Sequence, residues 1–431
     1  MTDTIFALSS GQPPAAIAIL RISGPHAFPA VQRLAGALPA PRQASLRTLR
    51  DGDAHLDQAL VLVFPGPRTA TGEDLAELHL HGGRAVVRAV EAALAATPGL
   101  RGAEPGEFTR RALTNGRIDL TEAEGLADLL AAETEAQRRT ALRAAEGGIR
   151  RQIEEWTARA LQLSAVIEAS LDHADEADVA AEGELLDRVR RQAGALAREM
   201  ETALDQPAVE RLHDGIRVVL AGSPNVGKST LLNALAEREA AIVSPLAGTT
   251  RDRIEAPVMR EGIAYLLTDT AGLHDAPADI VERIGIDRAQ QSLAEADLIL
   301  WLDDQAPPVE VATRPHLLLH ARADAADRGD APAGRLPVSA KNGEGVAALW
   351  QAIDAIAREL LPANDAVLLN RRQRDLVAIA VEGVRSAAAG EDTLLIAEDL
   401  RRTLRTFDRI TGAADVESML DTLFSRFCIG K

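Results

Sequence analysis

The sequence contains a glycine-rich loop of the kind that binds the phosphate groups of a nucleotide. It occupies residues 222–229 and reads Gly-Ser-Pro-Asn-Val-Gly-Lys-Ser. The apolar run 216–220 comes before it and the helical pattern of residues 231–235 follows, so the loop is predicted to lie where a strand turns into a helix. Backbone N–H groups and a helix N-terminus there suit anionic oxygens, Lys228 can reach the terminal phosphates, and the Ser229 hydroxyl can ligate Mg2+.

Four further motifs follow the loop in the order that a GTPase requires. Residues 248–252 read Gly-Thr-Thr-Arg-Asp and lie between a predicted helix and a predicted strand, where a threonine can reach Mg2+. In Asp-Thr-Ala-Gly, Asp269 can hold a Mg2+-bound water while the Gly272 N–H meets the γ-phosphate. Asp324 is placed to accept hydrogen bonds from guanine N1 and N2, and residues 339–341, Ser-Ala-Lys, can line the base pocket. Each motif is weak alone, but the ordered set predicts a GTP-binding domain.

The base-reading motif departs from the usual Asn-Lys-x-Asp. It stands as Ala321-Arg322-Ala323-Asp324, so the guanine-reading carboxylate is present but the asparagine amide is missing. A missing hydrogen bond can cost about 1 to 3 kcal/mol. We therefore expect weaker binding or weaker discrimination of guanine, with GTP still the predicted nucleotide.

A second departure concerns the residue after Gly272, where Ras-like proteins carry a water-orienting glutamine. Here it is Leu273, which cannot orient water. An arginine finger at this point is worth roughly 10³ to 10⁵ in rate. We expect a monovalent cation, held by Asn225 and the loop before Gly248, to supply the positive charge instead. Glu282 is a candidate for orienting water through an intermediary, the alternative being a solvated helix glutamate.

The composition bounds the class of protein. The chain has 431 residues, 46% of them hydrophobic but only 3% aromatic, which predicts roughly three domains rich in helix. Its one cysteine, Cys428, excludes an internal disulfide framework and any cysteine-rich zinc module. A formal net charge of -17 argues against nonspecific nucleic-acid binding, so any RNA contact must be local. Without a membrane-length apolar run or a signal-peptide pattern, we expect a cytoplasmic protein with no membrane partner.

Changes in pattern along the chain predict four segments. Residues 1–119 mix short strand-like runs with turn clusters and indicate a compact mixed α/β domain, whereas residues 120–212 and 363–431 are helical. Residues 213–362 alternate strands and helices, which indicates a doubly wound parallel sheet. We infer one helical domain interrupted by an inserted P-loop domain; two separate helical units are the alternative. The expected strands are 16–22, 59–64 and 75–80 in the first segment and 216–220, 265–267, 298–302, 317–319 and 336–338 in the insertion.

The helical segments carry apolar stripes at helical spacing. The acidic stretch 174–184 is predicted to break the first helix. The first stripe consists of Ile149, Ile153, Trp156, Ala160, Leu163 and Ile167, and a second, after the break, of Leu185, Val189, Leu196, Met200 and Leu204. Towards the C-terminus, Leu400, Leu404 and Phe407 share one face and Val416, Met419, Leu423 and Phe427 another.

The motifs taken together resemble the bacterial tRNA-uridine modification GTPase family MnmE, also called TrmE. Besides the GTPase motifs, the resemblance rests on segments 20–24, 71–78, 81–83 and 105–112 and on the terminal Cys-Ile-Gly-Lys, so it runs from end to end. It implies a multidomain α/β and α fold, with an N-terminal α+β folate-binding-like domain, a helical domain and an inserted doubly wound P-loop G domain.

The resemblance also implies partners and chemistry. With an FAD-dependent MnmG-type partner, the family adds an aminomethyl-type (carboxymethylaminomethyl) group to C5 of the wobble uridine in certain tRNAs, using a tetrahydrofolate derivative as one-carbon donor. Mg2+, K+ and a homodimer are expected as well.

Site residues carry over by motif. K+ would be surrounded by Asn225, Ser244, Leu246 through its backbone, and Thr249; Mg2+ would be ligated by Ser229 and Thr250; and the catalytic glutamate corresponds to Glu282. The folate derivative would contact Arg21, Glu77, Arg117 and Lys431, with Arg117 standing where lysine is common. The expected nucleotide contacts are Asn225, Val226, Gly227, Lys228, Ser229, Thr230, Ser244, Pro245, Leu246, Ala247, Gly248, Thr249, Thr250, Asp269, Thr270, Ala271, Gly272, Asp324, Ser339, Ala340 and Lys341.

Three features keep two interpretations each. Cys428 is a candidate nucleophile or a packed residue between Phe427 and Ile429. His79 and His81 share one strand face and form either a metal pair or a simple polar face. The helical stripe Arg401, Arg405 and Arg409 either contacts tRNA or the partner, or is a solvated face.

The sequence thus predicts a K+-dependent GTPase whose hydrolysis cycle drives a tRNA-modifying complex. One alternative is a ribosome-assembly or RNA-chaperoning GTPase without modification chemistry. Another is a folate-dependent transferase with a vestigial G domain.

Overall fold

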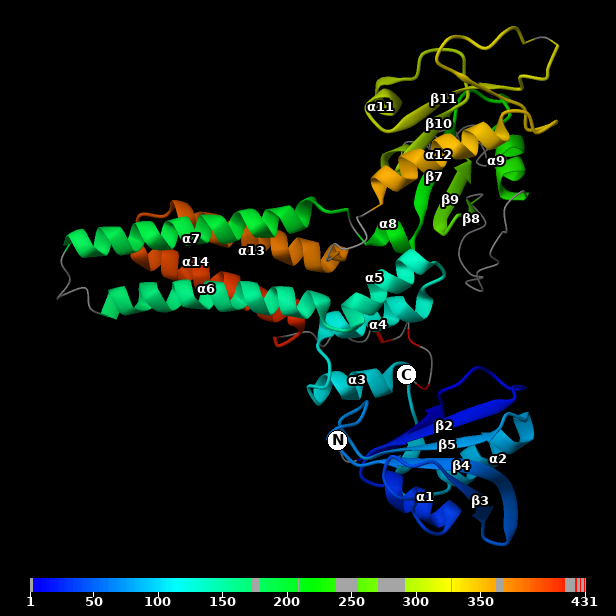
Figure 1. Cartoon of the computed structure of the whole chain (residues 1–431), viewed down its shortest axis with the longest axis vertical. Helices are drawn as coiled ribbons and strands as arrows, with labels where there is room; N and C mark the ends of the chain where they lie inside the picture. Colours follow the sequence, from blue (N-terminus) through cyan, green and yellow to red (C-terminus); the bar gives the residue numbers. More distant parts are fainter. Residues whose placement is uncertain are drawn as a thin grey trace, which may run out of the picture. The chain divides into compact units, whose positions relative to one another are not determined.

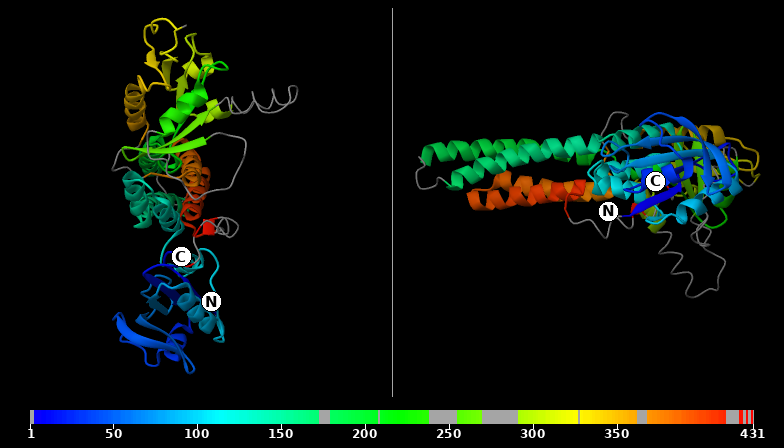
Figure 2. Two further views of the ribbon diagram at one scale, coloured as in Figure 1. Left: turned by 90° about the vertical axis from the view of Figure 1, so that its right-hand side faces the viewer. Right: turned by 90° about the horizontal axis from the view of Figure 1, so that it is seen from below.

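The structure, a computed structural model, describes residues 3–172, 179–207, 209–237, 255–269, 291–326, 328–361, 368–414, 423–424, 427 and 430. The chain forms two compact units, the first drawn from 1–130, 144–162 and 401–431 and the second from 131–143 and 163–400. Each contains one six-stranded sheet, coloured blue to cyan in the first unit and green to yellow in the second (Figure 1). Figure 2 gives two further views of the same elements.

The sheet of the first unit has the strand order β3-β4-β5-β2-β1-β6. Its neighbouring strands are antiparallel, apart from the parallel pair β1 and β6. The strand bounds are β1 Thr4–Leu8, β2 Ile17–Ser23, β3 Ser45–Asp51, β4 Ala54–Phe64, β5 Leu75–His81 and β6 Leu100–Gly102. The sequence predicts β2, β4 and β5 and misses the other three.

Buried apolar residues alternate with polar and exposed residues along the strands, so this sheet has one apolar face and one mixed face. Leu78 and Leu80 lie in the core beneath helices α1 and α2, while the register brings Arg21 and Glu77 together on the other face. Phe108 of helix α3 packs on that second face. The helix bounds are α1 Ala27–Ala35, α2 Arg84–Ala95 and α3 Glu107–Thr114.

The first predicted apolar stripe lies on one long helix, α6. All six residues of the stripe are buried, which confirms the prediction. The Trp156 ring lies near that of Phe407 in α14, with centroids 6.4 Å apart and ring planes tilted by 35°. The bounds here are α4 Leu120–Ala131, α5 Glu135–Ala145, α6 Gly148–Asp172 and α14 Thr393–Thr411.

Helices α7 (Val179–Asp205) and α13 (Arg371–Ala389) lie side by side in the second unit (Figure 1). The Arg374 guanidinium of α13 donates to the backbone carbonyls at the end of α7, and a capping box starts α13. The predicted break over 174–184 is too long, because residues 179–184 are already helical. Alanine and acidic residues in a first turn favour a helix start, which explains the error.

A small apolar cluster joins the two ends of the P-loop domain. Val209 and Leu212 come before its first strand, Leu368 comes after its last helix, and these three side chains pack together with Ala136 and Leu361 at the edge of the cluster. The Gln137 side-chain amide also donates to the Leu212 carbonyl at 2.6 Å. The chain therefore enters and leaves this domain at one place.

The P-loop domain is a doubly wound sheet with the strand order β12-β11-β10-β7-β9-β8. The first five strands in this order are parallel, and β8 pairs antiparallel with β9. The strands are β7 Ile216–Ala221, β8 Glu255–Arg260, β9 Ile263–Asp269, β10 Leu298–Trp301, β11 His316–Ala321 and β12 Leu336–Val338. The helices are α8 Glu210–His213, α9 Lys228–Glu237, α11 Val309–Ala312 and α12 Val346–Leu360. All five strands that the sequence predicts here are present.

A buried polar cluster ties helix α12 to the outer strands of this sheet. The Tyr265 hydroxyl donates to Asp354 Oδ1 at 2.6 Å, and Arg260 Nε donates to Asp354 Oδ2 at 3.0 Å. The Trp350 ring packs edge-on against Tyr265 at 5.3 Å between centroids. Burial and the neighbouring Asp354 carboxylate raise the pKa of Tyr265 well above its ordinary value.

Among the described residues, none of the helices combines the length and the apolar character that crossing a membrane requires.

Replacing Tyr265 by phenylalanine is expected to destabilise the P-loop domain by about 1 to 3 kcal/mol, because the buried Asp354 loses a donor. The raised pKa keeps the phenol proton bound in the folded state where the unfolded chain releases it, so wild-type stability should fall as pH rises above about 10. Urea unfolding at neutral and alkaline pH measures both effects. Tyr265→Phe should flatten the alkaline slope, and an unchanged slope would contradict the assignment.

Candidate functional site

The phosphate loop connects the end of β7 at Ala221 to the start of α9 at Lys228. Gly222, Asn225 and Gly227 have positive φ angles of 144°, 61° and 104°. Backbone of this kind forms a concavity of N–H groups that binds anions, and glycine adopts it without strain. The local geometry therefore matches the phosphate loop that the sequence predicts.

Lys228 lies inside this loop. Its side chain is 5% exposed, and Nζ donates to the carbonyls of Gly222 and Ser223 at 2.9 Å each. Burial lowers the pKa of Lys228, against the opposing effect of the Asp269 and Asp303 carboxylates. The ammonium group is thus held at the phosphate loop by backbone oxygens.

The Ser229 hydroxyl donates to the carboxylate of Asp269 at the end of β9. Asp269 is 4% exposed, so two oxygen-bearing side chains meet beside the phosphate loop. Oxygen ligands are those that Mg2+ takes in nucleotide sites, and the pair fits such an ion. Thr250, the other expected Mg2+ ligand, lies outside the described residues.

Asp303 is a site residue that the sequence reasoning missed. It follows β10 and accepts hydrogen bonds from both the Ser223 N–H and the Ser223 hydroxyl, at 2.7 Å each. A carboxylate just beyond the carboxyl end of a parallel strand was the available signal, because ligand sites of open α/β sheets lie at that edge.

The base-reading motif begins at the end of β11, at the same edge of the sheet. Asp324 accepts a hydrogen bond from the buried Ser339 hydroxyl at 2.6 Å. This bond and the charges of Lys341 and Arg322 hold the pKa of Asp324 below its ordinary value. Arg322 has a φ of 58°, and its Cγ lies 3.6 Å from where a Cβ on Gly227 would be. The arginine stem therefore lies against the phosphate loop.

Several expected site residues lie outside the described residues. They are Ser244, Pro245, Leu246, Ala247, Gly248, Thr249, Thr250, Thr270, Ala271, Gly272, Leu273, Glu282, Cys428 and Lys431.

In the first unit, Arg21 and Glu77 form an ion pair on the mixed face of the sheet. Arg21 Nη2 lies 3.0 Å from Glu77 Oε1, and His79 Nε2 lies 3.2 Å from Glu77 Oε2. His81 instead pairs with Asp57, at 2.7 Å between Nδ1 and Oδ1. The two histidines therefore share a face, as predicted, but each contacts its own carboxylate.

Arg117, a third expected folate contact, donates from Nε to the Thr69 carbonyl at 3.2 Å. The loop that starts at Thr69 is fixed from its other end, because Glu73 accepts hydrogen bonds from Ser23 at 2.8 Å and from Arg111 at 3.1 Å. The conformation of this loop thus links Arg117 to the strand that carries Arg21.

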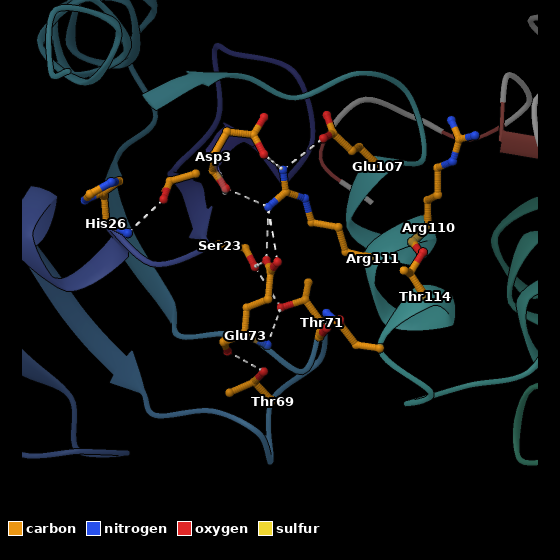
Figure 3. A network of polar contacts seen from close by, with 12 residues as sticks. Asp3, Ser23, His26, Thr69, Thr71, Glu73, Glu107, Arg110, Arg111 and Thr114 are labelled. Carbon is orange, nitrogen blue, oxygen red and sulfur yellow. Dashed lines mark hydrogen bonds and ion pairs between the residues drawn. The ribbon is translucent and has the colours of Figure 1, made fainter. Parts of the chain in front are cut away.

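Arg111 is fully buried at the centre of that network (Figure 3). Its Nη2 also donates to Asp3 at 3.0 Å and to Glu107 at 3.1 Å. Burial alone would raise the pKa of Glu107, but hydrogen bonds from Arg101, from the Glu104 N–H and from Arg111 hold it below its ordinary value. Glu73, Glu107 and Arg111 belong to the segments that carry the family resemblance, and their contacts serve the fold of the first unit.

The C-terminal segment lies against the same domain. The Ser9 hydroxyl donates to the Gly430 carbonyl at 2.7 Å, and a Cβ on Gly430 would lie only 2.1 Å from the Leu8 carbonyl oxygen. Phe424 packs on Gly106, and its ring lies near that of Phe427, with centroids 5.7 Å apart and ring planes tilted by 51°. Among the described residues of the C-terminal segment, Gly430 thus lies against the end of strand β1.

A family model described as the MnmE helical domain matches residues 120–428, and one described as the GTP-binding protein TrmE N-terminus matches residues 4–117. The tRNA modification GTPase MnmE of Novosphingobium aromaticivorans is 53% identical over 441 residues, covering 100% of both chains. The chain belongs to the MnmE family. Proteins of the same name from Sphingopyxis alaskensis and Zymomonas mobilis are 55% and 49% identical, over 96% and 99% of this chain and 100% of each relative.

Membership of the MnmE family fits the order of domains in the structure. The match to the helical domain spans 120–428, and the P-loop sheet falls inside that range, as expected for an insertion.

A crystal structure of Aquifex aeolicus Era bound to GDP.AlF4- is 24% identical, covers 39% of this chain and 66% of its own, and has a TM-score of 0.26.

Replacing Asp324 by asparagine is expected to change which nucleotide binds. The amide can donate to the C2 carbonyl of XTP, but its single acceptor oxygen cannot accept from guanine N1 and N2 together as the two carboxylate oxygens do, so GTP affinity should fall about tenfold or more while XTP affinity rises. Competition against a fluorescent nucleotide measures both. Lys228→Ala is the control, since it should weaken both nucleotides alike. Unchanged discrimination in Asp324→Asn would show that another residue reads the base.

Proposed function

We propose that this protein is a tRNA modification GTPase, and that GTP hydrolysis in its P-loop domain drives the modification of a wobble uridine. The full-length relatives that carry this name, at 49% to 55% identity, are the observation that carries the proposal. The geometry supports it, because the phosphate loop, Asp269 and the base-reading Asp324 meet at one edge of the sheet. Measuring GTP turnover, and wobble nucleosides in tRNA from a strain lacking the protein, tests it.

Mg2+ and K+ are the ions we assign to this site. The Ser229 hydroxyl and the Asp269 carboxylate are suited to Mg2+, which would neutralise phosphate charge when bound. Asn225 offers a side-chain oxygen for K+ from a left-handed position in the phosphate loop. We assign Ser244, Leu246 and Thr249 to the same K+ and Glu282 to orienting water, on the motif match alone.

We further propose that the protein works with an FAD-dependent MnmG-type partner to add a carboxymethylaminomethyl-type group at C5 of the wobble uridine. The one-carbon donor is a tetrahydrofolate derivative held by Arg21, Glu77, Arg117 and Lys431. The match of the N-terminal segment to the TrmE model supports this assignment over the alternative of a ribosome-assembly GTPase, and the nearly complete nucleotide motifs oppose a vestigial G domain.

A homodimer is also part of the proposal. The mixed face of the first sheet exposes Ile17, Leu46 and Leu60, at 58%, 58% and 42%. The strand register places these three apolar side chains on the same face as Arg21 and Glu77. Exposed apolar groups gathered on one sheet face favour association with a second copy.

GTP hydrolysis is expected to be about tenfold or more faster in K+ than in Na+ at constant ionic strength, because Leu273 cannot orient water and a cation must supply positive charge. Asn225→Ala should flatten the difference by removing a ligand oxygen. Phosphate release assays in matched chloride salts measure this. Equal wild-type rates in the two salts would rule out the cation mechanism.

Deleting the last four residues is expected to abolish wobble-uridine modification while the protein stays folded and hydrolyses GTP. The deletion keeps the buried side chains of Phe424 and Phe427, and truncating such an anchor typically costs about 3 to 5 kcal/mol. Nucleoside mass spectrometry, GTP turnover and thermal melting give the three readouts.

Two smaller changes separate the roles within this terminus. Cys428→Ser tests thiol chemistry, and removing Lys431 alone tests a charge contact to folate. Full modification by the four-residue deletion would show that the terminus is not essential.

A further inference from the structure

Two consecutive carboxylates follow strand β10, and they contact different loops of the nucleotide site. Asp303 accepts from the Ser223 N–H and hydroxyl of the phosphate loop at 2.7 Å each. Asp304 contacts His320 of β11 at 2.9 Å and Arg328 at 3.1 Å. The same short segment therefore ties the phosphate loop and the base-reading loop to one strand end.

Asp304 contacts residues on both sides of the base-reading motif 321–324. His320 immediately precedes Ala321, the first residue of the motif, and Arg328 follows Asp324 in the loop between β11 and β12. Arg328 Nε also donates to the Ala321 carbonyl at 3.2 Å, which closes the loop on itself, while its Nη2 forms the ion pair with Asp304. The loop that carries Asp324 is thus anchored through one carboxylate.

His320 makes this anchor specific. Its ring is 3% exposed, and Nδ1 lies 2.9 and 3.1 Å from the two Asp304 oxygens. Within the described part of the chain, the other ring nitrogen has no hydrogen-bond partner. A buried ring nitrogen without a hydrogen bond costs free energy. The ring therefore favours the position in which Nδ1 donates to Asp304.

The motif itself provides less support than usual here. Ala321 occupies the position where an asparagine amide is expected, and alanine offers no side-chain hydrogen bond. Two hydrogen bonds hold the loop to β12 and to the turn that follows it: the Ala323 N–H donates to the Val338 carbonyl at 3.2 Å, and the Ser339 hydroxyl donates to Asp324 at 2.6 Å.

We propose that Asp304, with His320 and Arg328, is a positioning unit for guanine recognition in this protein, supplying the support that the missing asparagine amide would give. None of the three touches the base in this assignment; they fix the loop from which Asp324 reads N1 and N2. The proposal rests on the proposed GTPase function, since it assumes that Asp324 meets a guanine nucleotide.

The test compares GDP with IDP, which lacks the 2-amino group that Asp324 is assigned to read. In Asp304→Ala, GDP affinity should fall about fivefold while IDP affinity changes less than about twofold, so the preference for GDP shrinks. Competition of each nucleotide against a fluorescent GDP analogue gives the two dissociation constants. Arg328→Ala should shift the preference in the same direction, and it serves as the readout if Asp304→Ala does not fold.

Arg358→Ala is the matched control, because Arg358 lies in the same domain on helix α12 and forms an exposed ion pair with Glu261, away from the base-reading loop. It should leave the GDP preference unchanged. Equal losses of GDP and IDP affinity in Asp304→Ala and Arg328→Ala, or no loss, would overturn the positioning role while the GTPase function stands. If the wild-type protein itself shows no preference for guanine nucleotides, the proposed function fails instead.

Discussion

The nucleotide site depends on one constraint, the parallel hydrogen-bonded pairing of strands around β7. Because β9 and β10 both run parallel to β7, their carboxyl ends meet at one edge, and the register sets Leu220 opposite Asp269 and Ala221 opposite Trp301. Loops from distant parts of the sequence consequently converge on the phosphate loop. A shift in the β7–β9 pairing would separate Ser229 from Asp269, and a shift in the β7–β10 pairing would separate Ser223 from Asp303, although neither contact is part of the strand pairing.

In the first unit, the contacts of one buried charged side chain take the place that strand pairing has in the nucleotide site. Arg111 has no exposed surface and contacts Asp3, Glu73 and Glu107. Breaking such a buried pair typically costs about 3 to 5 kcal/mol, because a partner charge is left without compensation. Through Arg111, the Glu73 carboxylate therefore shapes the loop beside Arg117, whereas the Arg21 and Glu77 pair lies on the mixed sheet face.

The sequence predicted what is local and missed what is tertiary. Residues 222–229 could be assigned because loop, strand and helix are contiguous, and the stripe on α6 because six apolar positions repeat at helical spacing. Asp303, Asp304 and Arg328 were missed: the position of Asp303 after a parallel strand was a signal for the edge of the site, but the contacts of all three residues are set by the loops that pack beside them. Strands β1, β3 and β6 were missed for a related reason: runs of five, seven and three residues with few β-branched side chains become strands through their neighbours.

The apolar cluster of Val209, Leu212 and Leu368 has a topological consequence. Because the chain enters and leaves the P-loop domain at this single patch, the whole domain is an insertion between two neighbouring points of the fold. The helical segments before and after it are therefore brought together whatever the length of the insertion. Loop-closure entropy grows only slowly with length, so an insertion of this size costs the flanking helices little free energy. The domain could accordingly have been gained as a unit, without disturbing the packing of α7 on α13.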